Sequence, residues 1–123
     1  MSGREKGSMV DNERQTTTVT IALKGDLSVQ TLAELRESLA QADGCDVVIL
    51  DLREVDYVDS TTLTAFVRLR GRLGGGGRTG VVRIAAPTSS VRRIFEICHL
   101  DKLFQLYDTL EEATLSGDPP AAL

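Results

Sequence analysis

Val47-Val48-Ile49-Leu50-Asp51-Leu52 is followed a few residues later by Asp59-Ser60-Thr61-Thr62-Leu63, and together the two segments predict a buried strand that leads into a helix. The first segment is apolar apart from Asp51 and begins with β-branched residues, which is typical of a central strand covered on both faces of a parallel sheet. We expect the hydroxyl of Ser60 to lie at a solvent-facing junction beside a helix N-terminus, where free backbone N–H groups favour anions. Such a position is suited to a phosphoryl switch.

The residues before this strand predict another strand followed by an amphipathic helix. Apolar and more polar residues alternate over residues 18–23, a period of two that indicates a strand with one wetter face. Gly25-Asp26 is expected to end this strand, and Ser28 to cap the next element. Apolar residues then recur at helical spacing over residues 32–42, which predicts a helix with one buried face.

The residues after the Ser60 junction predict two further strand–helix units. Leu63, Phe66 and Val67 are expected on the buried face of the helix that starts near Ser60. In chain order we expect this helix to end at the Gly74-Gly75-Gly76-Gly77 run, followed by a strand over residues 81–85, a helix opened by Pro87-Thr88, a short strand within residues 103–107 and a brief helix capped by Thr109.

Strands that alternate with helices predict a single α/β domain with right-handed crossovers. We expect a mostly parallel central sheet of about four strands flanked by about four helices. Residues 16–115 are expected to form this domain, with a flexible N-terminal tail at residues 1–15 and a C-terminal tail at residues 116–123. An edge strand around Met9-Val10 is the alternative for part of the N-terminal tail.

The composition is that of an ordinary globular protein. Of the 123 residues, 41% are apolar and 26% charged, and the net charge of −4 argues against a nucleic-acid surface, which needs a basic stripe. No run of about 18 apolar residues predicts a membrane span, and the polar start of the chain does not resemble a signal peptide. We therefore expect a cytoplasmic protein.

Sites for catalysis, metals and cofactors are not visible in the sequence. His99 is the single histidine and lies just past a predicted helix, where it is expected to take left-handed backbone. Cys45 and Cys98 lack metal-ligand spacing; Cys98 is expected in the core and Cys45 partly exposed. The glycine run lacks the spacing of a phosphate-binding loop and leads from a helix into a strand. We expect no enzyme activity, no metal and no cofactor.

Three carboxylates surround the Ser60 junction and leave two interpretations open. Asp51, Asp56 and Asp59 could hold a divalent ion, but we prefer a strand-end Asp51 and a helix-capping Asp59. For Ser60, the purely structural alternative is an N-cap whose oxygen accepts a hydrogen bond from a backbone N–H two or three residues later. Its place after a strand favours a functional role, because ligand sites in α/β sheets gather at the carboxyl ends of strands.

In this order, the segments resemble the STAS domain family, which includes anti-sigma factor antagonists and the cytoplasmic tails of sulfate transporters. The resemblance covers roughly residues 16–115. Gly25-Asp26-Leu27-Ser28 resembles the family's opening Gly-Glu-Leu-Asp. Leu50-Asp51-Leu52 and Asp59-Ser60-Thr61-Thr62-Leu63 resemble its central Asp-Leu and Asp-Ser-Ser-Gly-Leu. Its later helix is matched by Val91-Arg92-Arg93-Ile94-Phe95 with His99-Leu100.

The resemblance implies a phosphorylation switch. In anti-sigma factor antagonists of this family, the serine after the central aspartate is phosphorylated by a serine kinase that is also the anti-sigma factor; the matching residue is Ser60. The dephosphorylated protein would dock on the anti-sigma factor and free the sigma factor, phosphorylation would block docking, and a phosphatase would reverse it. The docking residues implied by the resemblance are Asp26, Ser28, Asp59, Ser60, Thr61, Thr62 and Thr64.

The sequence departs from the family pattern at Ser28, Thr62 and His99, where the family has Asp, Gly and Gly. The β-branched Thr62 is expected to add bulk beside the serine and to stiffen the first helical turn. These departures leave a second hypothesis open, a STAS module without a switch that serves as a scaffold or as the soluble subunit of a signalling or membrane transport complex. In that case the exposed face around Arg68, Arg72 and Thr64 would be a docking surface.

Overall fold

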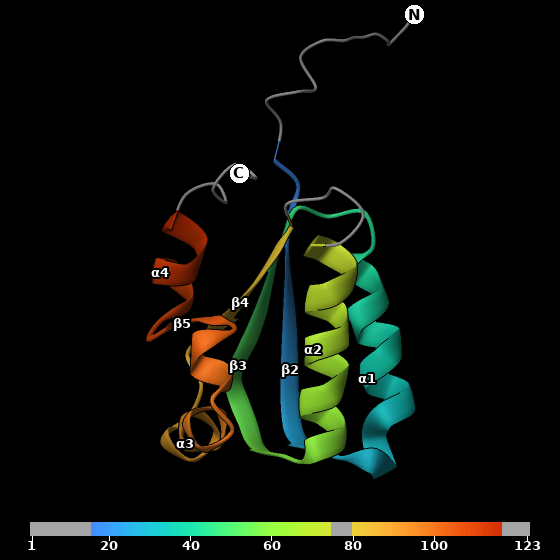
Figure 1. Cartoon of the computed structure of the whole chain (residues 1–123), viewed down its shortest axis with the longest axis vertical. Coiled ribbons are helices and arrows are strands. Elements are labelled where there is room, and N and C mark those ends of the chain that lie inside the picture. The colour runs from blue at the N-terminus through green and yellow to red at the C-terminus, as the bar shows by residue number, and fades with distance from the viewer. Residues whose placement is uncertain (1–15, 75–79, 117–123) are drawn as a thin grey trace, which may run out of the picture.

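The computed structural model describes residues 16–74 and 80–116, and in these residues four strands form one parallel sheet in the order β2-β3-β4-β5 (Figure 1). The sheet confirms the predicted α/β fold class. The predicted N-terminal tail at residues 1–15, residues 117–123 of the predicted C-terminal tail at residues 116–123, and residues 75–79, which include most of the glycine run, lie outside the described residues. The strands are β2 (Thr18–Leu27), β3 (Val47–Val58), β4 (Val81–Ala85) and β5 (Gln105–Tyr107).

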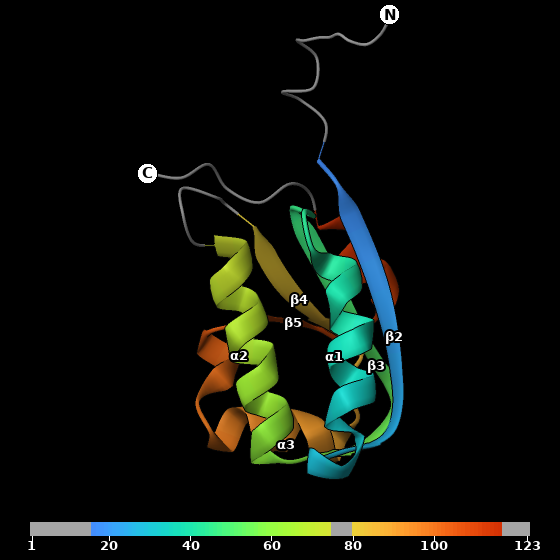
Figure 2. The same ribbon diagram turned by 90° about the vertical axis from the view of Figure 1, so that its right-hand side faces the viewer.

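Four α-helices of the described residues cover the two faces of this sheet. They are α1 (Leu32–Leu39), α2 (Ser60–Gly74), α3 (Ser89–Ile97) and α4 (Leu110–Leu115). Helices α1 and α2 lie side by side on one face and α4 lies on the other, while α3 packs near the carboxyl ends of the strands (Figure 1 and Figure 2). Within the described residues, no helix has the length and apolar character needed to cross a membrane.

Strand β3 is buried on both faces because its side chains alternate between two apolar clusters. Val48 and Leu50 belong to the larger cluster, which is shared with α1, α2 and α3. Val47 and Ile49 face the opposite way and pack with Ala113 of α4. The predicted central, doubly covered strand is therefore confirmed.

Strands β2 and β3 are both longer than the sequence pattern predicts. Gly25-Asp26 was expected to end the first strand, but β2 continues to Leu27 through two register shifts against β3, one of them at Gly25. Gly25 has a φ of +80°, a conformation that glycine adopts without strain, so the irregularity is absorbed within the strand. The pairing carries β3 on to Val58 and brings the two strand ends to the same edge.

Three burial predictions are wrong, and helix geometry explains two of them. Val67 is 37% exposed and Leu69 is buried in its place, because Leu69 lies three residues after Phe66 on the same face of α2. Cys98 is exposed because α3 ends before it and the chain turns at His99, whose φ of +61° confirms the predicted left-handed backbone. Cys45, just before β3, is buried in the larger core cluster.

Candidate functional site

The carboxyl ends of β2 and β3 bring most of the predicted site residues to one edge of the sheet. Leu27 pairs with Val58 at the end of the ladder, and the backbone N–H of Asp59 donates a hydrogen bond to the carbonyl oxygen of Leu27 at 3.1 Å. The turn that follows β2 and the first turn of α2 therefore leave the sheet next to each other. This edge is where ligand sites of parallel α/β sheets are found.

Asp59 connects these two segments through its side chain. Its Oδ1 accepts a hydrogen bond from the backbone N–H of Thr62 at 2.9 Å, which satisfies one of the free donors at the start of α2. Its Oδ2 accepts another from the backbone N–H of Val29 at 3.0 Å. The predicted helix cap at Asp59 is confirmed, and the cap also fixes the position of a turn thirty residues earlier in the chain.

These hydrogen bonds also determine the charge of Asp59. The N–H groups of Thr62 and Val29 stabilise the ionised carboxylate, and they hold the pKa of Asp59 below its ordinary value of 3.8. The carboxylate is therefore negatively charged at neutral pH. A fixed negative charge thus stands immediately before Ser60.

Ser60 is the first residue of α2 and not its cap, so the purely structural interpretation of this serine as an N-cap is wrong. Its side chain is exposed, and its hydroxyl makes no hydrogen bond to any described residue. The hydroxyl is therefore free to react or to contact another molecule. Because it stands in the first helical turn, negative charge added there is compatible with the helix dipole.

The turn after β2 is held in place by hydrogen bonds of its own. The Oγ of Ser28 accepts from the backbone N–H of Gln30 at 3.3 Å, and the Oγ1 of Thr31 accepts from the backbone N–H of Ser28 at 3.0 Å. Ser28 thus caps the 3-10 turn at Val29–Thr31, as predicted. Asp26 is exposed just before this turn.

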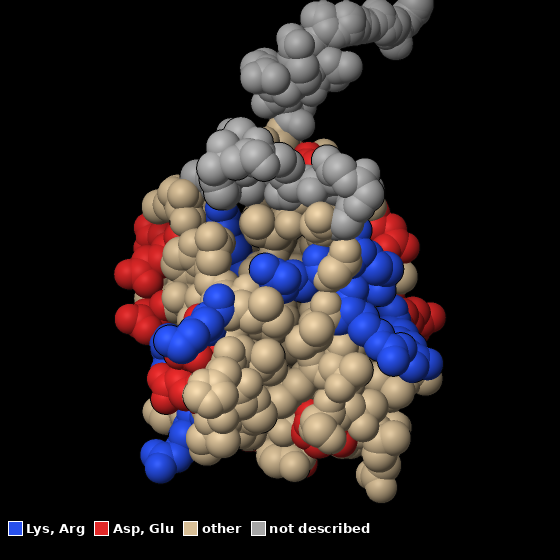
Figure 3. Space-filling view, in the orientation of Figure 1, with Lys and Arg blue, Asp and Glu red and all other residues tan. Residues whose placement is uncertain are grey.

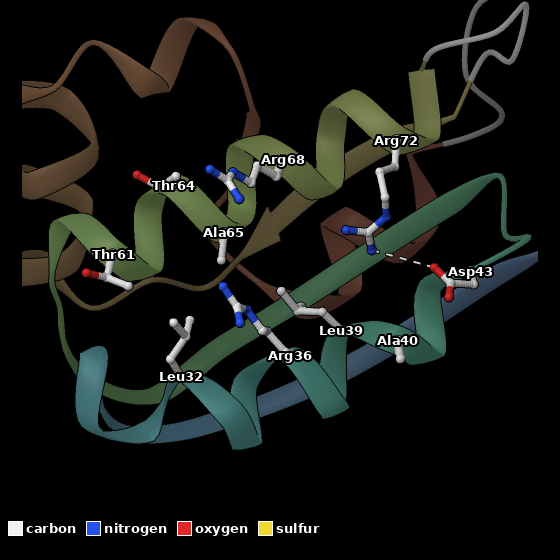
Figure 4. A pocket seen from close by; sticks show the side chains of 10 residues that line it. All are labelled: Leu32, Arg36, Leu39, Ala40, Asp43, Thr61, Thr64, Ala65, Arg68 and Arg72. Carbon is white, nitrogen blue, oxygen red and sulfur yellow. Dashed lines mark ion pairs between the residues drawn. The ribbon is translucent and has the colours of Figure 1, made fainter.

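The three threonines of the first helical turns have different surroundings. Thr62 is fully buried, and its Oγ1 has no hydrogen-bond partner among the described residues. The expectation that Thr62 adds bulk beside Ser60 is wrong, because its side chain faces the core and is not accessible to a partner. Thr61 and Thr64 line a groove between α1 and α2 (Figure 4).

The sequence also matches the family model of the STAS domain, over residues 9–113. The chain belongs to the STAS domain family. The match includes Met9-Val10, within the segment predicted to be an N-terminal tail.

Individual relatives of this STAS domain include regulators of sigma factors. The anti-sigma-F factor antagonist RsfB of Mycobacterium tuberculosis is 30% identical over 95 residues, which cover 76% of this chain and 75% of that protein. The crystal structure of an anti-sigma factor antagonist from Mycobacterium paratuberculosis has a TM-score of 0.68 and 26% identity, covering 83% of this chain and 86% of that chain. A sulfate transporter family protein from Wolinella succinogenes shares the fold, with a TM-score of 0.65 and 13% identity over 85% of this chain and 88% of that one.

Two apolar residues at the same edge of this STAS domain were not predicted as site residues. Val29 is 63% exposed in the turn that Asp59 holds, and Tyr57 is 49% exposed where β3 pairs with Asp26 of β2. Exposed tyrosines are frequent anchors in protein interfaces, and Val29 adds apolar contact area at the same edge as Tyr57. The residues around Tyr57 and Val29 are mostly polar and show no periodic pattern. The one signal in the sequence is Tyr57 itself, a large aromatic residue three positions before Ser60.

The other carboxylates do not form a metal site. No group of three or more His, Cys, Asp or Glu side chains within residues 16–74 and 80–116 is arranged to hold a metal ion. Asp51 lies inside the extended β3 and not at a strand end, and its Oδ2 accepts a hydrogen bond from Nη2 of Arg53 at 2.8 Å. This local ion pair explains how the carboxylate of Asp51 is accommodated in a buried strand.

Proposed function

We propose that this STAS domain is an anti-sigma factor antagonist that binds an anti-sigma factor through the edge around Ser60 and is released when Ser60 is phosphorylated. The single observation that carries the proposal is the exposed, unbonded hydroxyl of Ser60 in the first turn of α2, next to the ionised cap Asp59. The sequence relationship to RsfB supports the assignment to this class of regulator. Its action on a transcription regulator would place the protein in the cytoplasm.

The docking surface has an apolar centre and a polar margin. Val29 and Tyr57 supply the apolar contact area, while Asp26 and Ser28 lie beside them on the turn and strand end of β2. An interface of this kind gains most of its affinity from a few apolar or aromatic anchors that become desolvated. Hydrogen bonds along the margin then determine orientation and specificity.

Phosphorylation would change the charge of this surface more than its shape. A phosphoserine adds about two negative charges and three strong acceptor oxygens. The N-terminus of α2 tolerates them, so the domain stays folded, but they would stand next to the carboxylate of Asp59, on a surface that also carries Asp26. A partner surface that fits a neutral hydroxyl among these acids would meet concentrated negative charge, and docking would be lost.

In this proposal the domain is a substrate and a binding module and has no catalytic role. The kinase is the anti-sigma factor itself, and a phosphatase restores the binding-competent form. The folded unit comprises residues 16–115. Thr62 is left out of the docking surface because its side chain is buried, whereas Thr61 and Thr64 extend this surface along α2.

The proposal is tested by using the unmodified protein, Ser60→Ala and Ser60→Asp as baits in a lysate of the source organism, with captured proteins identified by mass spectrometry. We expect the unmodified protein and Ser60→Ala to capture a serine-kinase anti-sigma factor and Ser60→Asp to lose it. Ser89→Asp is the matched control, because Ser89 occupies the same position in α3.

Capture of the anti-sigma factor by all four baits would refute the switch while leaving the docking partner intact. Capture of a transport or scaffold subunit in its place would refute the assignment as an antagonist. Incubation of the purified partner with ATP, followed by mass spectrometry of the antagonist, would then show whether Ser60 is the residue that is modified.

A further inference from the structure

The groove between α1 and α2 combines arginine side chains with apolar ones. It has a volume of about 540 Å³ and is lined by side chains from both helices, three of them arginines (Figure 4). We propose that this groove binds an acidic, amphipathic helical segment of a partner protein. The inference does not depend on the phosphorylation of Ser60.

Positive charge is concentrated here although the chain as a whole is acidic. The net charge of the protein is −4, but the sequence of α2 contains three arginines and no carboxylate. Figure 3 shows Lys and Arg side chains gathered over the side of the molecule formed by α2 and α1. Arg70 does not line this groove; its Nε donates a hydrogen bond to the carbonyl oxygen of Leu103 at 2.9 Å. The groove arginines are Arg36 of α1 and Arg68 and Arg72 of α2.

Two of these three arginines have no carboxylate partner within the part of the chain that the structure describes. Arg72 pairs with Asp43 across the groove, with Nη2 and Oδ1 separated by 3.5 Å. Arg36 and Arg68 form no ion pair with any described residue, and they carry like charges on opposite walls. In Figure 4 Arg36 reaches from α1 toward α2, while Arg68 extends along α2 toward Thr64. An anionic occupant would relieve this repulsion and pair with both guanidinium groups.

The spacing and the floor of the groove favour a helix over a small anion. Arg68 and Arg72 are four residues apart, about 6 Å along the axis of α2, which matches carboxylates one turn apart on an opposing helix. The floor is apolar, formed by Leu32, Leu39 and Ala65. An occupant must therefore present apolar side chains flanked by carboxylates, which is the pattern of helix-in-groove recognition.

Nucleic acid fits this surface less well than an acidic protein segment. Binding of a phosphate backbone uses a long basic stripe, and the groove provides two unpaired arginines within a protein of net negative charge. Among the described residues no aromatic side chain lines the groove, so bases would find no ring to stack on. Charge complementarity and the floor together favour a peptide.

The test uses a synthetic, fluorescently labelled amphipathic helix with leucines along one face and glutamates one turn apart beside them. Its binding to the full chain is measured by fluorescence anisotropy. The control peptide has glutamine at every glutamate position. The protein variants are Arg36→Gln/Arg68→Gln and, as a matched control, Arg93→Gln, since Arg93 is an exposed arginine of α3 outside this groove.

We expect the glutamate peptide to bind the unmodified protein and Arg93→Gln equally, and Arg36→Gln/Arg68→Gln at least about tenfold more weakly. Raising the ionic strength is expected to weaken the binding, because the charges are partly exposed. Ser60→Asp is expected to retain peptide binding, because Ser60 does not line the groove, although Thr61 and Thr64 belong to both surfaces. Circular dichroism shows whether this variant is folded.

Several results would overturn the inference. These are absence of peptide binding by the unmodified protein, equal binding of the glutamine peptide, unchanged binding by Arg36→Gln/Arg68→Gln, and binding of a single-stranded oligonucleotide or of phosphatidylserine vesicles as tightly as the peptide. A dimer of the unmodified protein that Arg36→Gln/Arg68→Gln abolishes in analytical ultracentrifugation would assign the groove to a second copy of the chain and would equally overturn it.

Discussion

The strand–helix junctions at Asp59-Ser60 and at Thr88-Ser89 have nearly the same local construction. Each begins with a capping side chain that accepts a hydrogen bond from the backbone N–H three residues later, from Thr62 at 2.9 Å in α2 and from Val91 at 3.3 Å in α3. Each continues with a serine as the first helical residue. From the local sequence alone, both serines would therefore be equally good candidates for a phosphorylation site.

The difference lies in what surrounds the two serines. Beyond Asp59 the site includes the turn bonded to its Oδ2 and the exposed apolar residues Val29 and Tyr57. The α3 junction lies instead beside an ion pair in which Nη2 of Arg92 and Oδ1 of Asp108 are 2.7 Å apart. Phosphate at Ser60 would add to existing negative charge on a docking surface. A serine at the start of a helix is therefore a candidate switch because of the residues that surround it in the folded protein, and not because of its local sequence.

The largest expected effect is that of charge at the two serines. Ser60→Asp should weaken binding of the anti-sigma factor at least about a hundredfold, because like-charge juxtaposition in an interface costs several kcal/mol. Ser89→Asp should leave the affinity unchanged. Isothermal titration calorimetry with the purified partner measures both, and circular dichroism shows whether each variant is folded. If Ser60→Asp and Ser89→Asp lost partner affinity equally, the proposed difference between the two junctions would be contradicted.

The apolar anchors next to Ser60 should have a smaller effect. Tyr57→Ala and Val29→Ala are each expected to weaken partner binding about tenfold, since truncation of an interface anchor costs more than about 1 kcal/mol. Ile97→Ala is the control, because Ile97 is 67% exposed on α3, away from the Ser60 edge. Surface plasmon resonance would show the loss mainly in the dissociation rate. An Ile97→Ala effect as large as that of Tyr57→Ala would contradict the proposed surface.

The two caps should differ in their contribution to stability. Asp59→Ala removes the acceptor of two backbone N–H groups in different segments, whereas Thr88→Ala removes the acceptor of one. We expect Thr88→Ala to lower the free energy of unfolding by about 1 kcal/mol and Asp59→Ala to lower it more. Urea denaturation followed by circular dichroism measures both values. A smaller loss for Asp59→Ala would mean that the Val29 contact contributes nothing to stability.

The caps should also differ in their dependence on pH. The pKa of Asp59 is lower in the folded protein than its ordinary value of 3.8, so its contribution is complete above that value and is lost as the pH falls through the lowered pKa. The stability difference between the unmodified protein and Asp59→Asn should therefore shrink below about pH 4. The difference for Thr88→Ala should stay constant, because threonine does not titrate. Urea denaturation between acidic and neutral pH provides the measurement. If the stability loss of Asp59→Asn were as independent of pH as that of Thr88→Ala, the lowered pKa of Asp59 would be contradicted.

The smallest effect is expected from Thr62→Val, which gives α2 the same residue type that α3 has at its third position. Thr62 and Val91 occupy the same position in α2 and α3, and both are fully buried, but Thr62 carries a hydroxyl without a partner among the described residues. Thr62→Val should raise the free energy of unfolding by about 1 kcal/mol, because it removes a buried polar group of similar shape. Partner binding should not change. Destabilisation by Thr62→Val would indicate that this hydroxyl contributes to stability through the carboxylate of Asp59, whose pKa the Thr62 side chain helps to lower.

Much of this architecture follows from local sequence patterns. Apolar periodicity predicts the alternation of strands and helices, because a strand and a helix bury their side chains with different periods. Side-chain chemistry predicts the caps at Ser28, Asp59 and Thr109, since each carries an oxygen that can accept from a nearby N–H. These features depend on residues only a few positions apart.

The long-range features could not be predicted in this way. The bond from Val29 to Asp59 joins residues thirty positions apart and exists because β2 continues past Gly25 alongside β3. Thr62 lies four residues before Phe66 on the packed face of α2, but its hydroxyl gives no apolar signal for that face in the sequence. Strand register and helix packing result from pairing between distant segments, which local propensity does not encode.

The sequence by itself therefore determined the α/β class, the order of elements and the position of Ser60 at the start of a helix, because these depend on periodicity and on neighbouring side chains. Only the tertiary structure decided that the turn at Val29 is bonded to Asp59, next to Ser60, and that Arg36 of α1 faces the arginines of α2 across a groove. Each of these arrangements joins segments that are distant in the chain, and their spacing is set by strand pairing and helix packing.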